Sequence, residues 1–214
     1  MILKNFVVFE GGDGSGTTTQ LGLLQRRFTG LVPTLPPLYA TWEPTDGPIG
    51  RILRSALSGE ISLQRETLGL LFAADRQEHV YGPGGIRERS ERGDLVVCDR
   101  YVLSSLVYQG IDCGEELVQR WNEAFPLPEG IFFFDIAGEK AIVRLEKRPV
   151  KDRYEYLDFQ LQVRERYRAL LPQYERQGVW VEIIDASQEP LTIAEEVWRV
   201  LKNMPIVKET GGGL

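Results

Sequence analysis

The sequence has little cysteine and histidine, with 2 cysteines and 1 histidine among 214 residues. Two thiols are too few for a disulfide framework or a four-thiolate metal site, and a lone imidazole excludes a multi-histidine zinc centre. Cys98 directly follows the apolar run Leu95-Val96-Val97, so we interpret it as a small buried apolar residue.

An excess of positive charge is also missing, because 25 Lys and Arg face 31 Asp and Glu and the formal net charge is -6. Binding to nucleic acid without sequence preference needs a basic face, so we expect no nucleic-acid partner. An anionic ligand must instead be held by a local cluster of cations.

Long apolar stretches are absent as well. No run approaches the roughly 18 residues that a membrane-spanning helix needs. The chain passes from Met1 directly into a strand-like run, without the pattern of a signal peptide. We therefore expect no membrane association and a cytoplasmic location.

Short apolar runs alternate along the chain with longer helical patterns, as they do in βαβ units. The runs are rich in Val, Ile and Phe, which is typical of parallel strands covered on both faces. They lie at 6–9, 38–41, 95–98, 131–134 and 179–184, and the helical patterns lie at 19–28, 50–57, 63–80, 104–107 with its continuation, 139–147, 154–176 and 191–202. The pattern predicts a single α/β domain over residues 1–207, with a flexible tail at 208–214.

A glycine-rich loop joins the first predicted strand to the first predicted helix, which is the context of a phosphate-binding loop. Gly11 and Gly16 match the outer glycines of the G-x-x-x-x-G-K-[ST] pattern and Thr18 its magnesium-binding hydroxyl, whereas Thr17 replaces the lysine. A purely structural turn is the alternative. The loop predicts the P-loop NTPase fold, with three layers and a central parallel β-sheet flanked by helices. The predicted nucleotide-binding residues are Gly11, Gly12, Asp13, Gly14, Ser15, Gly16, Thr17, Thr18 and Thr19.

Asp99 and Arg100 come directly after a buried strand. The carboxyl edge of a parallel sheet is where ligands bind, so both charges are expected at a ligand site. The carboxylate could hold Mg²⁺ and the guanidinium could bind a phosphate. A local ion pair at the end of the strand is the alternative.

A dense basic run with an internal proline stands out in this acidic chain. Such a run is usually a solvated face. Beside a phosphate-binding loop it predicts instead a lid, around residues 144–155, that closes over phosphates. Its cations are Arg144, Lys147, Arg148, Lys151 and Arg153, on either side of Pro149.

Phe72 and Arg76 are four residues apart in a predicted helix and therefore share one face. An aromatic ring beside a guanidinium could stack on a nucleotide base and hydrogen-bond its edge. The alternative for Phe72 is an ordinary core position.

In their order along the chain, these segments resemble the thymidylate kinase family. The similarity covers nearly the whole chain and rests on several ordered motifs. They are Phe9-Glu10-Gly11-Gly12-Asp13-Gly14-Ser15-Gly16, Glu43-Pro44 with Pro48-Ile49-Gly50, Leu71-Phe72-Ala73-Ala74-Asp75-Arg76, Asp99-Arg100-Tyr101 with Ser104-Ser105 and Tyr108, and Asp152-Arg153-Tyr154-Glu155.

The resemblance implies a kinase that makes dTDP from dTMP and ATP, with Mg²⁺ held by Thr18 and Asp99. It implies that Phe72 stacks on thymine and that Arg76 donates to the base. It further implies that Arg100 binds the dTMP phosphate and that Asp13 lies near the acceptor sugar and phosphate. The remaining implied substrate-binding residues are Glu43, Ser105 at the base, Tyr108 at the 2′ position of the sugar, and Tyr154 and Glu155 after the lid.

The family's members without a basic residue after the P-loop acid, as here with Gly14, supply the catalytic arginine from the lid. By this resemblance Arg148 and Arg153 are candidates, with Lys147 and Lys151 in reserve, and Asp13 and Arg100 complete the predicted catalytic set. The chain departs from the family pattern at Thr17 and at Trp42, and both changes remove a positive charge.

Two alternatives to an active dTMP kinase stay open. One is a nucleotide-binding pseudokinase, which the lost charges favour. The other is a kinase of the same fold for another nucleotide. The family also suggests a homodimer, and the helix with Leu63, Leu68, Leu70 and Leu71 has more apolar positions than one amphipathic face requires.

Overall fold

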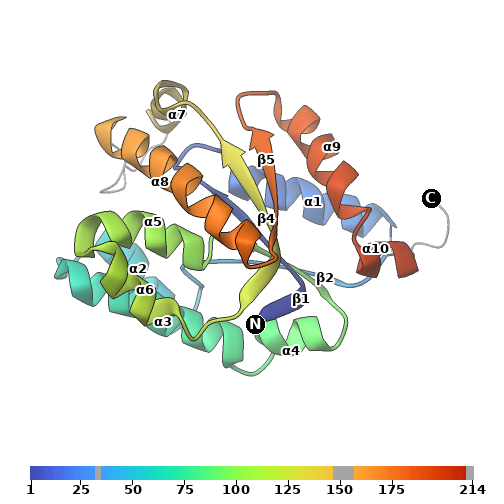
Figure 1. Ribbon diagram of the computed structural model, residues 1–214, viewed down its shortest axis with the longest axis horizontal. Coiled ribbons are helices and arrows are strands. Elements are labelled where there is room, and N and C mark those ends of the chain that lie inside the picture. The colour runs from blue at the N-terminus through green and yellow to red at the C-terminus, as the bar shows by residue number, and fades with distance from the viewer. Residues whose placement is uncertain (32–34, 147–156, 211–214) are drawn as a thin grey trace.

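The computed structural model describes residues 1–31, 35–146 and 157–210. Its centre is a sheet of five parallel strands in the order β2-β3-β1-β4-β5 (Figure 1). The strands are β1 (Ile2–Gly11), β2 (Leu38–Trp42), β3 (Leu95–Asp99), β4 (Leu127–Asp135) and β5 (Trp180–Asp185).

Helices cover both faces of the sheet, which confirms the predicted three-layer fold (Figure 1). One face packs against α3, α4, α5 and α8, and the other against α1, α9 and α10. The described helices are α1 (Thr17–Leu31), α2 (Pro48–Leu57), α3 (Arg65–Tyr81), α4 (Ile86–Glu91), α5 (Val102–Cys113), α6 (Glu115–Asn122), α7 (Gly138–Leu145), α8 (Leu157–Arg176), α9 (Pro190–Leu201) and α10 (Pro205–Thr210).

The apolar strands supply two cores because successive side chains point to opposite faces. In β1, Phe6 and Val8 pack with α5 and α8, whereas Val7 and Phe9 pack with α1 and α9. Since both faces of the sheet are covered, the sequence of the strand is a continuous apolar run and does not alternate between apolar and polar residues.

The strand order places a topological switch point between β1 and β3. The chain leaves β1 for β2 and β3 on one side and then crosses over to β4 and β5 on the other. Phe9 pairs with Asp99 across the sheet, and the Arg100 N–H donates to the Phe9 carbonyl oxygen at 2.9 Å. The loops after β1 and β3 are therefore neighbours, at the edge where such sheets bind ligands.

Three helices were not expected from the sequence. α4, α6 and α10 have between six and eight residues, too few to show a clear helical period. α10 includes residues 208–210, which the sequence analysis assigned to the tail. α3 ends at Tyr81, one residue beyond the predicted helical pattern 63–80, and Gly82 follows it.

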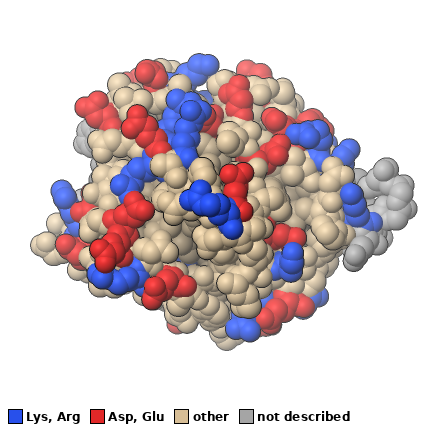
Figure 2. All heavy atoms as spheres, in the orientation of Figure 1, with Lys and Arg blue, Asp and Glu red and all other residues tan. Residues whose placement is uncertain are grey.

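The first residues of the predicted helix 154–176 lie outside the described residues. None of the described helices is both long and apolar enough to cross a membrane. Basic and acidic side chains are interspersed on the face shown in Figure 2.

Candidate active site

The loop between β1 and α1 has the backbone of an anion-binding loop. Gly14 and Gly16 have φ angles of 80° and 93°, in the left-handed region that favours glycine. α1 begins at Thr17, so the unpaired N–H groups of its first turn lie at the end of the loop. A Cβ at Gly11 would come within 2.9 Å of the Phe134 carbonyl oxygen, so a larger residue does not fit there unless the backbone shifts.

A cleft of about 410 Å³ opens beside this loop, and we call it the donor cleft. Ser15 Oγ is buried there without a hydrogen-bond partner among the described residues, a state that a bound phosphate oxygen would relieve. The lining residues are Gly14, Ser15, Gly16, Thr19, Gln20, Arg144, Ser187, Gln188, Glu189, Pro190 and Ile193.

The position of the missing lysine holds no charge. Thr17 is buried, with 5% of its surface exposed, and is not among the residues that line the donor cleft. Arg144 at the end of α7 does line it, and its Nη1 donates to the Gly14 carbonyl oxygen at 3.2 Å. Arg144 is thus a cation of the predicted lid segment that the structure describes and that reaches the P-loop.

The two predicted magnesium ligands lie together. Thr18 Oγ1 donates to Asp99 Oδ2 at 2.6 Å, although 81 residues separate them in the sequence. Asp99 Oδ1 is buried and has no hydrogen-bond partner within the described part of the chain. A hydroxyl beside an unsatisfied carboxylate oxygen is a donor set that suits a hard cation such as Mg²⁺.

A second cleft, of about 150 Å³, lies beyond β1 and β3, and we call it the acceptor cleft. It gathers residues that the sequence analysis named from separate segments: Asp13, Glu43, Phe72, Arg76, Arg100, Ser105 and Tyr108. Pro44, Leu57, Tyr101, Ser104 and Gln109 complete the lining.

Arg100 links the acceptor cleft to the P-loop. Its Nη2 donates to Asp13 Oδ1 at 2.6 Å and its Nη1 to the Gly11 carbonyl oxygen at 3.1 Å. The guanidinium carbon lies 5.2 Å from the centre of the Tyr108 ring. The backbone of Arg100 has a φ of 70°, which is uncommon for a residue with a side chain and is found often at functional sites.

Arg76 lies at the deep end of the acceptor cleft, with 1% of its surface exposed. Its Nε donates to Glu43 Oε2 at 2.9 Å and its Nη2 to Ser105 Oγ at 3.0 Å, while its Nη1 donates to Asn122 Oδ1. Burial opposes both charges of the Arg76–Glu43 pair. Burial is the largest single effect, but the mutual attraction and the neighbouring hydrogen bonds, including that of His79 to Glu43, together outweigh it, so the pKa of Glu43 is lowered and the pKa of Arg76 is raised.

Phe72 lies one turn before Arg76 in α3 and is partly buried. It packs against Leu53, Ala56 and Leu68 and also lines the acceptor cleft. The two interpretations of Phe72 are thus compatible, because one side of its ring can support the core while the other faces a ligand.

The comparisons with known proteins agree with this geometry. A family model described as thymidylate kinase matches residues 9–197. A Treponema pallidum (strain Nichols) protein that carries the name thymidylate kinase is 40% identical over 204 residues, which cover 94% of this chain and 96% of that protein. The chain belongs to the thymidylate kinase family.

Two further relatives and a solved structure extend the match. Proteins of Pyrobaculum aerophilum and Methanocaldococcus jannaschii with thymidylate kinase names are 37% and 35% identical, over 93% and 96% of this chain and 97% and 100% of theirs. The thymidylate kinase of Candida albicans has the same fold, with a TM-score of 0.76, 21% identity and coverage of 94% of this chain and 92% of that one. The fold is that of the P-loop NTPases, as predicted, and thymidylate kinases are phosphotransferases.

Glu10 is a member of this site to which the sequence analysis gave no role. The residue is fully buried at the end of β1. Its Oε2 accepts hydrogen bonds from Ser104 Oγ at 2.6 Å and from the Tyr167 hydroxyl at 3.0 Å, and its Oε1 accepts from the Tyr101 N–H at 3.0 Å. Burial raises the pKa of Glu10 to about 7, although these hydrogen bonds and the charge of Arg100 oppose the shift.

Gln160 is a second residue of this region that was not expected from the sequence. From α8 its Oε1 accepts from the Asp13 N–H at 3.0 Å and its Nε2 donates to Asp13 Oδ2 at 2.9 Å. Asp13 is therefore held by Gln160 on one side and by Arg100 on the other. A glutamine within a helical pattern carries no signal of such a contact, whereas a carboxylate inside an apolar strand, as at Glu10, is such a signal.

Several predicted lid residues lie outside the described residues: Lys147, Arg148, Lys151, Arg153, Tyr154 and Glu155. Their roles stay predictions. Of the cations in the basic run, the structure describes Arg144.

We predict that Glu10→Gln flattens the pH dependence of stability. The pKa of Glu10 is about 7 in the fold against 4.5 without its neighbours, so between these values the folded state binds more protons than the unfolded state. The free energy of unfolding must then fall as the pH rises from about 4.5 to about 7, by at most about 3 kcal/mol. Glutamine cannot titrate and removes this loss.

Urea unfolding at pH 5, 6, 7 and 8 measures the effect. Glu175→Gln, an exposed position in α8, is the matched control and should follow the wild type. A Glu10→Gln variant with the pH dependence of the wild type would show that another group titrates.

Proposed function

We propose that this protein is an active dTMP kinase, which transfers the γ-phosphate of ATP to dTMP with the help of Mg²⁺. The observation that carries the proposal is that the two clefts adjoin at the P-loop. Asp13 lines the acceptor cleft, and the next residue, Gly14, lines the donor cleft. Phosphoryl transfer depends on placing the two phosphates in line and close together.

The deep end of the acceptor cleft supports a thymine base. The guanidinium of Arg76 has only donors, so it suits the carbonyl at C4 of thymine and not the amino group at C4 of cytosine. Phe72 forms part of the wall, where an aromatic ring can stack on any base. Selection of the base would thus come from Arg76, with Phe72 adding affinity.

The mouth of the acceptor cleft supports a phosphate. Arg100 carries a planar fork of donors that matches phosphate oxygens, and Asp13 and the Gly11 carbonyl oxygen fix its direction. Thr18 and Asp99 would hold Mg²⁺, which neutralises charge on the donor phosphates in this type of reaction.

The positive charge that Thr17 does not supply must come from another residue. Arg144 already reaches the P-loop, and we propose that Arg148 and Arg153 of the lid complete the charge around the transferred group. Catalysis of phosphoryl transfer rests chiefly on positioning and charge stabilisation, so the cation can arrive from any direction that reaches the phosphate.

A coupled assay of ADP release with dTMP, dUMP and other monophosphates tests the proposed function. The highest kcat/KM is expected with dTMP. Binding of dTMP and ATP without ADP release would support a pseudokinase, the alternative that Thr17 favours. Higher kcat/KM with a different monophosphate would identify a kinase for another nucleotide.

We predict that Phe72→Ala weakens dTMP binding by about 5- to 150-fold, since a stacking aromatic contributes about 1–3 kcal/mol per base. ATP affinity should be nearly unchanged, because Phe72 lies outside the donor cleft lining. Titration calorimetry with each nucleotide measures both. An equal loss of both affinities would identify Phe72 as a core residue only.

We predict that Arg148→Ala and Arg153→Ala lower kcat by at least about 100-fold, with a smaller effect on dTMP affinity. Thr17→Lys should partly restore turnover in these variants, because it returns the missing charge to the P-loop. Steady-state kinetics of the single and double variants measures both effects. Full activity in the lid variants would show that the charge comes from elsewhere, with Arg144 the next residue to test.

We predict a homodimer that uses the outer face of α2 and α3. Leu68 is buried, but Leu70 of α3 and Ile52 of α2 are 49% and 44% exposed, and exposed apolar side chains on two helices in contact can form an interaction surface. Sedimentation at micromolar concentration should give twice the chain mass of 24.3 kDa, and Leu70→Asp should give the monomer. Leu191→Asp, at an exposed leucine of α9, should leave the dimer intact, and a monomeric wild type would contradict the prediction.

A further inference from the structure

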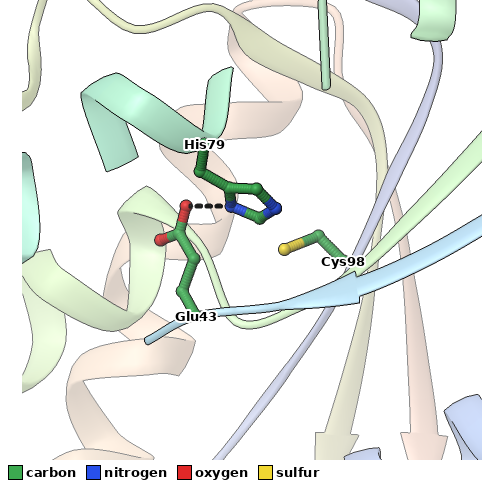
Figure 3. Close-up of side chains that lie close together, drawn as sticks. All are labelled: Glu43, His79 and Cys98. Carbon is green, nitrogen blue, oxygen red and sulfur yellow. Dashed lines mark hydrogen bonds and ion pairs between the residues drawn. The ribbon is translucent and has the colours of Figure 1, made fainter. Parts of the chain in front are cut away.

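His79, the one histidine of the chain, lies behind the acceptor cleft and is not among the residues that line it. It follows Arg76 by three residues in α3 and is buried, with 8% of its surface exposed. Figure 3 shows its ring directed at Glu43, with Cys98 of β3 close by.

Both ring nitrogens of His79 have a partner. Nδ1 lies 3.0 Å from Glu43 Oε1, and Nε2 lies 2.7 Å from Thr41 Oγ1. An ionised carboxylate can only accept, so Nδ1 must carry a proton, and when the ring carries this proton alone, Nε2 accepts from the threonine hydroxyl. The imidazole is therefore fixed from two sides.

The two carboxylate oxygens of Glu43 have different partners, His79 and Arg76. Oε1 accepts from His79, and Oε2 accepts from Arg76, at 2.9 Å from Nε and 2.7 Å from Nη2. Rotation of this carboxylate would break one contact or the other. The contacts Thr41–His79–Glu43–Arg76 thus form a continuous chain that ends at the group expected to read the base.

Glu43, His79 and Cys98, the three side chains drawn in Figure 3, do not suit a metal ion. The ligand atoms of Glu43, His79 and Cys98 lie within 4.8 Å of one another. However, the imidazole nitrogens are both engaged, and the charge of Arg76 already neutralises Glu43. Burial also raises the pKa of the Cys98 thiol, whereas a metal needs the thiolate.

We propose that His79 is a positioning residue that sets base selectivity by fixing Glu43 and, through it, the direction of the Arg76 donors. This inference rests on the proposed function of the acceptor cleft. An arginine side chain has many rotamers, and its fork discriminates a carbonyl from an amino group only when its donors are held toward position 4 of the base. Asn122 and Ser105 accept hydrogen bonds from the terminal nitrogens Nη1 and Nη2 of the guanidinium. Glu43, which His79 holds, accepts from Nε.

Two substitutions separate the two contacts of the ring. The amide nitrogen of asparagine is as many bonds from the backbone as Nδ1, and that of glutamine as many as Nε2. His79→Asn should therefore keep the hydrogen bond to Glu43 and lose the contact with Thr41, whereas His79→Gln should keep the contact with Thr41 and lose the hydrogen bond to Glu43. Dissociation constants for dTMP and 5-methyl-dCMP, which differ only in the pairing edge of the base, report the selectivity.

We expect His79→Gln to reduce the affinity ratio of dTMP to 5-methyl-dCMP at least about tenfold, the usual scale for a hydrogen bond to a charged group. ATP affinity should stay constant, and His79→Asn should keep most of the ratio. Gln77→Ala, exposed on the same helix, is the control and should match the wild type. An unchanged ratio in His79→Gln, an equal loss for both nucleotides, or an equal effect of the two substitutions would overturn the proposal.

The wild type provides a measurement that does not depend on the folding of variants. Because the chain has 1 histidine, ¹⁵N labelling of histidine gives ring signals from His79 alone. A protonated Nδ1 supports the arrangement, and an unprotonated Nδ1 would overturn it. If dTMP binds without ADP release, the proposed kinase activity fails but the affinity ratios still test His79. A wild type without preference for dTMP over 5-methyl-dCMP would overturn the proposal for His79, whereas ADP release with dTMP would still support the kinase activity.

Discussion

The buried ion pair between Glu43 and Arg76 constrains much of the acceptor half of this protein. Taking both charges out of water is costly, and removing one partner of such a pair costs roughly 3–5 kcal/mol because the other charge is left uncompensated. Every oxygen and nitrogen of the pair therefore needs a partner. The partners His79, Asn122 and Ser105 come from α3, α6 and α5, so the pair fixes the relative positions of three helices.

Asp75, the residue before Arg76, holds the loop that follows β2. Asp75 accepts hydrogen bonds from the N–H and the hydroxyl of Thr45 at 2.7 Å and 2.6 Å. The loop after β2, which carries Glu43, is thereby attached to the helix that carries Arg76. One turn of α3 thus holds both Arg76 and, through Asp75, the loop whose Glu43 neutralises it.

The phosphate half of the site follows from the strand order. Because β1 and β3 are neighbours at the switch point, the P-loop and Arg100 meet at the same edge of the sheet. Asp13 is held there between Arg100 and Gln160, and Glu10 supports Ser104 from behind. Thr17 leaves this half with less positive charge than the usual P-loop pattern supplies, and the guanidinium of Arg144 lies beside the loop at Gly14.

The sequence by itself determined the strands, the long helices, the P-loop and the family, because each depends on a local pattern of apolar, glycine and charged residues. It also named most residues of the acceptor cleft, but only as separate motifs, and it did not single out Leu57 or Gln109. The tertiary structure decided which of them touch: Thr18 with Asp99, Arg100 with Asp13, and Arg76 with Glu43. The contacts of Gln160, Asn122 and His79 could not be predicted, since a polar side chain in a helix shows its partner only after folding. Glu10, a carboxylate in an apolar strand, signals a buried contact, but the sequence does not show with which residues. The contact of Gln160 with Asp13 joins residues 147 positions apart, and only the packing of α8 against the P-loop makes them neighbours.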